Sequence, residues 1–390
     1  MRQMNILSEQ STRLIEKTKM EEQMRLVIDC FKQVKGAGKS IGIYNLARHL
    51  VWELAGNHSS RKNAQNEIIV LGNAYNKKDF DVAGVTFIEI QKNPFSKLTC
   101  IKWELFDVSV LAKKLGADKV LFPRGYASML HLTKEYVIIH DMIPFYYNEH
   151  YKGYFNRLEN FYIMWRLKAS AKHADKVITI SEASKRDIMK YAHTDDKRIT
   201  VVYNGYTQIE NTQFIKKETY AEGDGDYIIA MTSKLPHKNA KGIAKAYACY
   251  RKAASTPLPM TVIGVEGVET EGITWIGYVE RDEDLHQMLH NAKAFLFLSL
   301  VEGFGFPPIE AMQLETPVVC SGVSSLPEVV GDAALLVNPH DANAVAQALI
   351  RVTTDDAYAQ ELVERGLHNA ERFNWEKTGD KYREVLFDEI

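Results

Sequence analysis

Short apolar runs alternate with longer amphipathic stretches along most of this chain. The runs are continuous, which is typical of strands buried on both faces of a parallel sheet. We expect strands at residues 24–30, 68–71, 85–90, 119–122, 136–140, 177–180, 199–202, 227–231, 260–263, 273–276, 294–298, 317–320 and 334–337. Helical spacing follows the first of them, in the stripe Ile43, Leu46, Ala47, Leu50, Val51 and Leu54. The alternation predicts an α/β fold of doubly wound parallel sheets.

The apolar pattern lapses between Tyr203 and Asp226, where polar residues and glycines predominate. A chain of 390 residues exceeds the size at which one hydrophobic core keeps growing, so two domains are expected. We predict a leader over residues 1–23, a first Rossmann-like domain over 24–208 and a second over 209–374. No function is assigned to the leader.

The strongest chemical signal lies in Ser299–Cys320, SLVEGFGFPPIEAMQLETPVVC. Gly303 and Gly305 follow an apolar run, at the carboxyl end of a strand, where open α/β sheets bind ligands. Glycines let a ligand approach backbone N–H groups, and the positive end of the next helix favours a phosphate. Glu302 and Glu310 only accept hydrogen bonds, so they suit sugar hydroxyls. Two glutamates alone would be ordinary solvated positions, but the Gly-Phe-Gly and Pro-Pro elements between them favour a site.

This stretch resembles the E-x7-E signature of the retaining glycosyltransferases of family four, which have the GT-B fold of two Rossmann-like domains facing a cleft. The resemblance covers about residues 24–390 and is strongest in 174–205 and 275–339. It implies that Glu310 holds the ribose of a nucleoside-diphosphate-sugar and that Glu302 holds the hexose. It implies that a final helix, 375–390, packs on the first domain, and that Ser181 and Asn204 border the cleft. Further donor contacts are implied for Gly303, Phe304, Gly305, Phe306 and Ile309.

A cation is expected near the donor diphosphate, because breaking the sugar–phosphate bond builds negative charge on the leaving group. Lys238 occupies the position at which the family usually carries a lysine for this purpose. The family often has an arginine six residues earlier, where this chain has Thr232, and His237 replaces another frequent arginine. Lys234 is the candidate for the second positive charge, so Thr232 and Lys234 join the predicted donor site.

A second glycine loop, GAGKS, follows the first predicted strand. A Walker A loop needs a glycine where this chain has Gln33, and we expect Ile41 and Gly42 to separate the loop from its helix. We therefore set a P-loop nucleotidase aside. The resemblance implies that the loop lets the backbone approach the acceptor or the donor phosphates, through Gly36, Gly38, Ser40 and Gly42.

His140 ends the strand predicted at 136–140. A lone histidine is more often a packed or surface residue than a functional one. The family, however, carries a histidine at the matching place, in contact with the donor sugar. We therefore group His140 with Lys238 and Glu302 as the predicted catalytic residues.

Aromatic and basic residues are mixed between Tyr146 and Lys172. This mixture is typical either of a helix on an anionic membrane interface or of a core-facing helix with a solvated basic edge, and both remain open. Residues 1–205 contain 32 Lys and Arg against 22 Asp and Glu, whereas residues 206–390 contain 16 against 28. Unless this partition is chance, the basic half favours an anionic partner: a lipid-diphosphate-linked acceptor, a soluble phosphorylated acceptor or a membrane surface.

The four cysteines have no metal-ligand spacing and fit free thiols in a reducing compartment. No apolar stretch is long enough to span a membrane and no signal peptide is evident. We expect a cytoplasmic protein, peripheral at most on the inner face of the plasma membrane. Asp224-Gly-Asp226 spells a metal-binding triplet, but it precedes a strand instead of following one. We expect no metal, no cofactor and no nucleic-acid partner.

Taken together, the motifs predict a retaining, metal-independent hexosyltransferase. It would move mannose, rhamnose, glucose or a similar hexose to a glycan or lipid-linked acceptor, in cell-surface polysaccharide synthesis. The resemblance implies a front-face, oxocarbenium-like transfer in which the leaving phosphate takes the acceptor's proton, so no general base is expected. A nucleotide-sugar epimerase and a non-catalytic sugar-nucleotide binding protein remain as alternatives. A dinucleotide-dependent oxidoreductase is excluded, because no G-x-G-x-x-G follows a strand.

Overall fold

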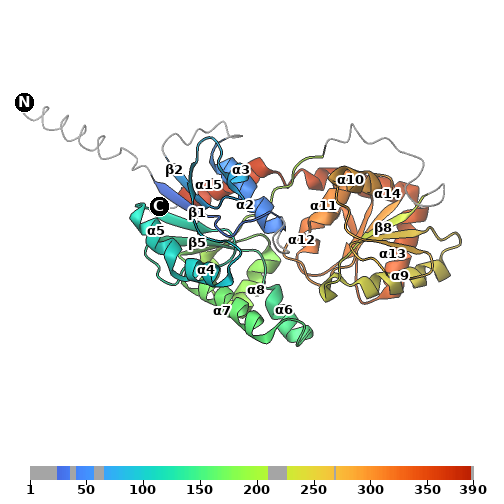
Figure 1. Ribbon diagram of the computed structural model, residues 1–390. Helices are drawn as coiled ribbons and strands as arrows, with labels where there is room; N and C mark the ends of the chain where they lie inside the picture. The colour runs from blue at the N-terminus through green and yellow to red at the C-terminus, as the bar shows by residue number, and fades with distance from the viewer. Residues whose placement is uncertain (1–23, 36–40, 57–65, 210–225, 268, 388–390) are drawn as a thin grey trace, which may run out of the picture. The chain divides into compact units, whose positions relative to one another are not determined.

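The computed structural model describes residues 24–35, 41–56, 66–209, 226–267 and 269–387 (Figure 1). The predicted leader and residues 210–225 of the predicted linker, with Asp224 of the acidic triplet, lie outside this range. The chain forms two compact units. The first comprises Met1–Ile138, Ala169–Ile178 and Gly379–Ile390, and the second comprises Ile139–Lys168 and Thr179–Thr378. The domain boundary at residue 208 stays a prediction.

One sheet has seven strands in the order β3-β2-β1-β4-β5-β6-β7. The neighbouring pairs from β3 to β5 are parallel. Its strands are β1 (Arg25–Asp29), β2 (Glu67–Gly72), β3 (Thr86–Glu89), β4 (Lys119–Phe122), β5 (Lys134–Ile139), β6 (Lys176–Thr179) and β7 (Ile199–Val201). The central strands are buried on both faces, which explains their continuous apolar runs.

The other sheet has six parallel strands in the order β10-β9-β8-β11-β12-β13. Its strands are β8 (Ile228–Met231), β9 (Met260–Ile263), β10 (Ile273–Ile276), β11 (Ala294–Phe297), β12 (Val318–Ser321) and β13 (Ala334–Val337). Every strand of both sheets lies within two residues of a predicted one. The prediction of two doubly wound, Rossmann-like sheets is confirmed.

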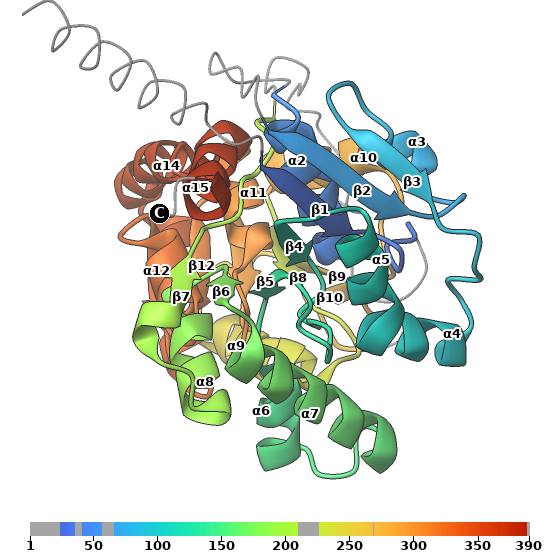
Figure 2. The same cartoon turned by 90° about the vertical axis from the view of Figure 1, so that its left-hand side faces the viewer.

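Helices connect the strands of both sheets (Figures 1 and 2). Those before residue 200 are α2 (Ile41–Leu54), α3 (Lys77–Phe80), α4 (Lys97–Lys102), the π-helical turn η1 (Trp103–Asp107), α5 (Val108–Lys114), α6 (Ile143–His150), α7 (Arg157–His173), α8 (Glu182–Ala192) and the 3-10 turn η2 (Asp196–Arg198). Those after residue 200 are the 3-10 turn η4 (Pro236–Lys238), α9 (Ala240–Ala253), α10 (Asp282–His290), α11 (Phe306–Gln313), α12 (Leu326–Val330), α13 (Ala342–Thr354), α14 (Asp356–Ala370) and α15 (Trp375–Phe387).

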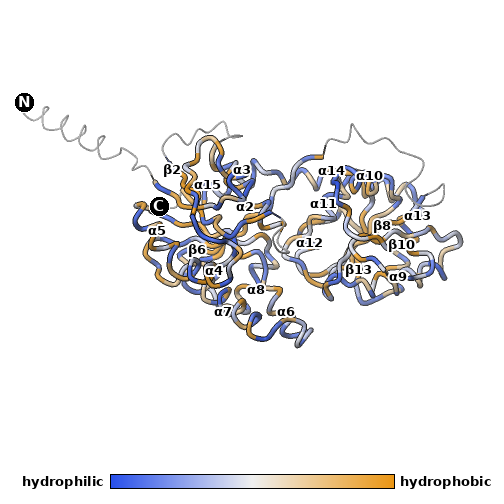
Figure 3. The backbone as a smooth tube through the Cα atoms, in the orientation of Figure 1, coloured by the Kyte–Doolittle hydropathy of each residue, from blue (hydrophilic) through white to orange (hydrophobic). Residues whose placement is uncertain are grey.

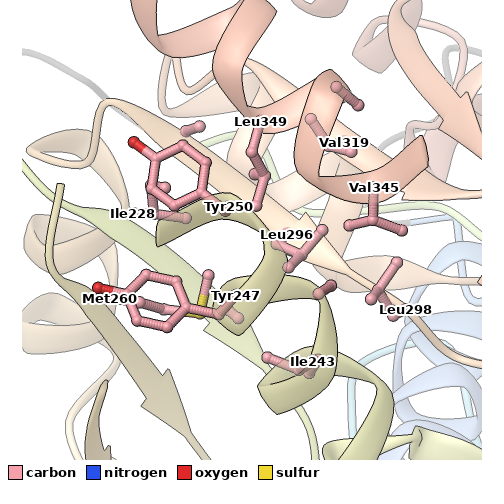
Figure 4. Packing of buried hydrophobic residues seen from close by; sticks show 14 of the residues in the cluster. Ile228, Ile243, Tyr247, Tyr250, Met260, Leu296, Leu298, Val319, Val345 and Leu349 are labelled. Carbon is pink, nitrogen blue, oxygen red and sulfur yellow. The ribbon is translucent and has the colours of Figure 1, made fainter. Parts of the chain in front are cut away.

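The core of the six-stranded sheet shows how alternate side chains divide between its faces. Leu296 and Leu298 of the β11 segment pack with Ile243, Tyr247 and Tyr250 of α9 and with Val345 and Leu349 of α13 (Figure 4). Hydrophobic residues accordingly concentrate in the strands, whereas the connecting segments contain more hydrophilic residues (Figure 3). Burial of these side chains, at about 25 cal/mol per Å2 of apolar surface, is the main stabilising contribution to this layer.

The start of α2 corrects one detail of the sequence analysis. The helix begins at Ile41, so Gly42 lies in its first turn and not in the preceding loop. Tyr44 is the first buried residue of the helix, so the turn before it carries none of the buried stripe from which the helix was predicted. The argument that Ile41 and Gly42 separate the GAGKS string from a helix was therefore wrong, while the missing glycine at Gln33 still argues against a Walker A loop. Gly36, Gly38 and Ser40 lie outside the described residues.

The last helix, α15, is anchored by hydrogen bonds at several points. Near its start, Thr378 donates to the carbonyl oxygen of Tyr203 at 3.0 Å, within the second unit. Within the first unit, Arg383 donates to the carbonyl oxygen of Glu53, and Lys119 donates to that of Leu386 at 2.6 Å. Buried polar groups gain partners in this way, so the part of α15 from Gly379 onward is a structural part of the first unit.

Cys30, Cys100 and Cys320 are buried free thiols, and Cys249 is half-buried. No described helix combines the length and the apolar character that crossing a membrane requires.

Candidate functional site

The strand order of the six-stranded sheet brings two predicted site segments together. Strands β8 and β11 are direct neighbours, although they are not consecutive in the sequence. Connections leave β8 and β11 on opposite sides of this pair, which makes their carboxyl ends the switch point at which such sheets bind ligands. Lys238 follows β8 and Glu302 follows β11, and Lys238 Nζ lies 2.5 Å from Glu302 Oε1. Two of the three predicted catalytic residues therefore form one ion pair.

The backbone around Lys238 is held by hydrogen bonds to the ends of the strands. The Thr232 hydroxyl, at the position of the family's frequent arginine, donates to the carbonyl oxygen of Lys238 at 2.8 Å. Asn239 has φ +59°, caps α9 by accepting from Gly242 N–H, and donates to the carbonyl oxygen of Leu298. Thr232 thus contributes by positioning the lysine, since a hydroxyl carries no charge to a phosphate.

Serine hydroxyls donate hydrogen bonds to the carbonyl oxygens of the loop that contains Gly303 and Gly305, called the glycine loop below. Ser324 donates to the carbonyl oxygen of Glu302 at 2.7 Å, and Ser325 to that of Phe304 at 2.6 Å. Ser181, which caps α8, donates to the carbonyl oxygen of Gly303 at 2.7 Å. Within the described residues, no hydrogen bond from the N–H groups of Gly303, Phe304 or Gly305 is formed. The carbonyls are thus satisfied by the protein, which leaves a row of N–H donors for a ligand.

Glu328 connects the starts of α8 and α12, the two helices that these serines precede. Its carboxylate accepts from the backbone N–H groups of Glu182 and Ala183, each at 2.9 Å, in the first turn of α8. A carboxylate at a helix N-terminus is favourable for both the free N–H groups and the helix dipole. Glu328 lies on α12, three residues after Ser325, so this contact fixes both serine-bearing segments against the loop.

Close packing requires the glycine at position 303. A Cβ atom there would lie 2.9 Å from the carbonyl oxygen of His140 and 3.2 Å from Asp141 Cβ. The His140 carbonyl also accepts from the Ser184 hydroxyl at 2.9 Å. The backbone of the third predicted catalytic residue therefore touches the glycine loop, while the contact of its side chain with a sugar stays a prediction.

Asp141 was not predicted as a site residue, although it directly follows His140. Its Oδ1 accepts from Ile143 N–H at 2.9 Å. Burial raises the pKa of this carboxyl to about 6, and the nearby Glu302 carboxylate adds to the rise while Lys238 opposes it. The site thus contains two carboxyls and one lysine whose charges influence each other.

Glu310 lies within α11, four residues after the helix begins at Phe306, in a different environment from that of Glu302. Its Oε1 lies 3.0 Å from His286 Nε2, on α10. Burial, and then the Glu310 carboxylate, raise the pKa of the Tyr206 phenol above its usual value. Tyr206 also packs near Phe306, with ring centres 5.9 Å apart. An imidazole and a phenol beside a carboxylate form a group of hydrogen-bonding side chains suited to neutral hydroxyl groups.

His237 and Lys234 both lie near the position of a second phosphate-binding cation, but they differ in burial and charge. His237 is buried and its Nδ1 lies 2.7 Å from the Tyr147 hydroxyl. Burial lowers the pKa of His237 to about 4, so its ring is neutral at pH 7 and cannot replace a phosphate-binding arginine. Lys234 is exposed, and no ion pair to it is formed within the described part of the chain. Its role as the second cation stays a prediction.

The remaining predicted donor residues differ in burial and backbone conformation. Phe304 and Ile309 are buried, so their side chains pack within the protein, and their contact with a donor stays a prediction. Gly305 has φ +118° and begins α11, a conformation that favours glycine. Among the described residues, no three His, Cys, Asp or Glu side chains gather in a way that could hold a metal ion.

Sequence reasoning missed several residues of this site. The hydroxyls of Ser184, Ser324 and Ser325, the imidazole of His286 and the carboxyls of Asp141 and Glu328 lie in segments that the motifs covered. A serine cluster has no chemistry that distinguishes it in a sequence, so its position became informative only with the fold. His286 could have been considered from helical spacing, since it lies one turn after Asp282 on α10, within the stretch where the family resemblance is strongest.

Two family models match successive parts of the chain. The model for "Glycosyltransferase Family 4" matches residues 64–207, and that for "Glycosyl transferases group 1" matches 211–368. The chain is similar to "O-antigen chain mannosyltransferase B" of Escherichia coli, with 33% identity over 236 residues, 55% of this chain and 61% of the relative. It is 28% identical over 281 residues to "O-antigen chain mannosyltransferase RfbU" of Salmonella typhimurium, covering 68% of this chain and 75% of that one.

Solved structures agree with this fold over nearly the whole chain. The structure of "WaaG, a glycosyltransferase involved in lipopolysaccharide biosynthesis" superposes with a TM-score of 0.67 at 14% identity, over 93% of this chain and 100% of that chain. "Anabaena Alr3699/HepE in complex with UDP and glucose" superposes with a TM-score of 0.63 at 15% identity, over 94% and 100%. At such low identity the superpositions establish the fold alone.

Proposed function

We propose that this chain, which belongs to the family 4 glycosyltransferases of the GT-B fold, transfers a hexose from a nucleoside-diphosphate-sugar to a glycan or lipid-linked acceptor. The observation that carries the proposal is the Lys238–Glu302 pair, 2.5 Å apart at the carboxyl ends of β8 and β11. A cation, a hydroxyl-binding carboxylate and free N–H groups at one switch point are what a sugar diphosphate requires. The relatives' names do not favour an epimerase or a non-catalytic binding protein.

The donor lies along the N-terminal half of α11, from the loop before the helix to Glu310. Lys238 forms an ion pair with the donor diphosphate in place of the one with Glu302. The Glu302 oxygens are then available to accept from hydroxyl groups of the hexose. The N–H groups of the glycine loop and the positive end of α11 share the phosphate charge. Glu310, supported by His286, accepts from the ribose hydroxyls.

Transfer retains the anomeric configuration and needs no metal ion. Lys238 and the backbone N–H groups stabilise the charge that develops on the departing diphosphate, the role that a divalent cation has in metal-dependent transferases. The leaving phosphate oxygen accepts the proton of the acceptor hydroxyl as the new glycosidic bond forms on the same face. No side chain is then required as a general base.

The hexose we favour is mannose, since both curated relatives described above are named as mannosyltransferases of the O-antigen chain. The acceptor is accordingly a growing cell-surface polysaccharide, carried on a lipid diphosphate. The reaction takes place in the cytoplasm at the inner face of the plasma membrane. The basic character of residues 1–205 supports an anionic acceptor or surface.

The proposal is tested by incubating the full chain with GDP-mannose, dTDP-rhamnose and UDP-glucose, with and without lipid-diphosphate-linked acceptors. Release of the nucleoside diphosphate and the anomeric configuration of the product are followed by NMR. We expect one donor to be consumed, chiefly when acceptor is present, with retention and without loss of rate in EDTA. Absence of release with every donor and acceptor would refute the transferase, inversion would refute the mechanism, and inhibition by EDTA would refute metal independence.

A further inference from the structure

We propose that the outer face of the α6–α7 segment is a docking surface for an anionic lipid bilayer. The surface, called the α6–α7 surface below, comprises exposed apolar residues and exposed cations: Tyr154, Phe155, Leu158, Phe161, Trp165, Lys152, Arg157 and Lys168. The proposal deepens the membrane location proposed above by naming the surface that would provide it, and its test requires no enzymatic activity.

The apolar residues of this surface are unusually exposed. Leu158 is 81% exposed and Phe161 is 71% exposed, and both belong to α7. With Trp165 they occupy positions i, i+3 and i+7, which lie on one face of a helix. Isolated exposed apolar side chains are normal, but several of them on one face indicate contact with a partner.

Exposed cations accompany the apolar face. Lys152 and Arg157 flank its start, and Lys168 continues the same helical stripe one turn beyond Trp165. No ion pair is formed by these three side chains within the part of the chain that the structure describes. Glu159 is the one acidic residue between positions 151 and 168. Lys168 Nζ lies 5.2 Å from the centre of the Phe145 ring, in a cation–π contact, so Lys152 and Arg157 are the cations that this surface offers to anionic lipid headgroups.

The same segment adjoins the candidate site. Helices α6 and α7 lie side by side in both views (Figures 1 and 2) and line an open groove of about 1030 Å3. Five residues of the α6–α7 surface line this groove: Lys152, Phe155, Arg157, Leu158 and Phe161. Tyr147 is also part of the lining, and its hydroxyl is 2.7 Å from Nδ1 of His237, the residue before Lys238. A bilayer on the α6–α7 surface would therefore present a lipid-linked acceptor next to the segment that carries the lysine.

The opposing interpretation is a core-facing helix with a solvated basic edge. Part of α7 does face the core, since Arg166 and Leu167 are buried. A solvated edge, however, would be expected to contain polar residues, whereas this edge contains Leu158, Phe161 and Trp165. The burial pattern therefore divides α7 into a packed face and an apolar outer face, and the second needs a partner.

The proposal is tested by flotation of the full chain with vesicles of phosphatidylcholine alone and vesicles that also contain phosphatidylglycerol. We expect binding to the anionic vesicles, weakened by added salt. Leu158→Glu should lower the vesicle affinity at least about tenfold, because it replaces an inserted apolar group by a charge. Lys152→Gln and Arg157→Gln should each lower it about fivefold.

Leu98→Glu is the matched control, because Leu98 is also a leucine that is 81% exposed, on α4. It should leave vesicle binding unchanged. The fluorescence of Trp165 supplies a second measurement: anionic vesicles should shift the emission to the blue, and Trp165→Phe should remove most of that shift.

Several results would overturn the proposal. Failure of the wild-type chain to float with anionic vesicles would do so, as would equal losses in the Leu158 and Leu98 variants. A dimer in analytical ultracentrifugation that Leu158→Glu converts to a monomer would assign the surface to a second copy of the chain. Vesicle binding without sugar transfer would leave this proposal standing and refute the proposed function instead.

Discussion

Two glutamates near helix α11 carry the same functional group in different surroundings. Before the helix, Glu302 lies in the loop after β11 and meets the cation of Lys238. Within the helix, Glu310 meets the imidazole of His286 and lies beside the phenol of Tyr206. The difference teaches that one carboxylate belongs to a charge-handling region, where phosphate chemistry takes place, and the other to a region that holds hydroxyl groups. Their shared motif does not imply a shared role.

The largest effect is expected when the charge of Lys238 is removed from the phosphate-binding region. Lys238→Ala should lower kcat by about 10²- to 10³-fold, because the charge on the departing diphosphate loses its main side-chain partner. Steady-state kinetics with a saturating donor would measure it. Lys241→Ala, an exposed lysine of α9, is the control and should change kcat less than about twofold. Similar losses in both variants would contradict the special role of Lys238.

A second change tests whether the loop geometry supports this region. In Gly303→Ala, the new Cβ would lie 2.9 Å from the His140 carbonyl oxygen, so the loop must move. We expect kcat/KM to fall by about 10- to 100-fold, since displacement of a catalytic group by about 1 Å has effects of this size. Gly322→Ala is the control, because its Cβ would have an ordinary contact of 3.5 Å. Normal kinetics in Gly303→Ala would show that the loop is more adaptable than its packing indicates.

The hydroxyl-binding region should respond in binding rather than in chemistry. Glu310→Gln should raise KM for the donor about tenfold, the cost of a hydrogen bond to a charged group, while kcat changes little. His286→Ala should have a weaker effect in the same direction, because it removes the support of the carboxylate and not the carboxylate itself. If Glu310→Gln lowered kcat as strongly as Lys238→Ala, the distinction between the charged region at Glu302 and the hydroxyl-binding region at Glu310 would fail.

The smallest effect concerns stability and pH. The pKa of Asp141 is raised to about 6 from 3.8, so the folded state binds its proton more tightly than the unfolded state does. The resulting stabilisation is present below about pH 4 and is lost as pH rises through 6. Asp141→Asn keeps an acceptor for Ile143 N–H but has no charge to bury. It should raise the free energy of unfolding by about 1–2 kcal/mol more at pH 7 than at pH 4.

Urea unfolding at pH 4 and pH 7 would measure this difference. Comparing the variant with the wild-type chain at each pH cancels contributions from other carboxyls such as Asp29, whose pKa burial also raises to about 6. An equal effect of Asp141→Asn at both pH values would contradict the raised pKa.

Most of the fold and part of the site could be predicted from local patterns. Continuous apolar runs predicted every strand within two residues, because burial on both faces of a parallel sheet demands such runs. The positions of Glu302, Gly303 and Lys238 after strands predicted that they lie at the ligand-binding edge. The start of α2 was predicted less well, because the first turn of a helix carries little of its apolar stripe.

By itself, then, the sequence determined which elements form, which residues lie at strand ends and which chemistry those residues offer. The tertiary structure decided which of them meet. Lys238 reaches Glu302 across 64 positions because β8 pairs with β11, and strand order depends on the packing of whole layers rather than on local pattern. The serines and Glu328 around the glycine loop were decided in the same way. Their chemistry is common, and only the fold aims it at the carbonyl groups that fix the loop.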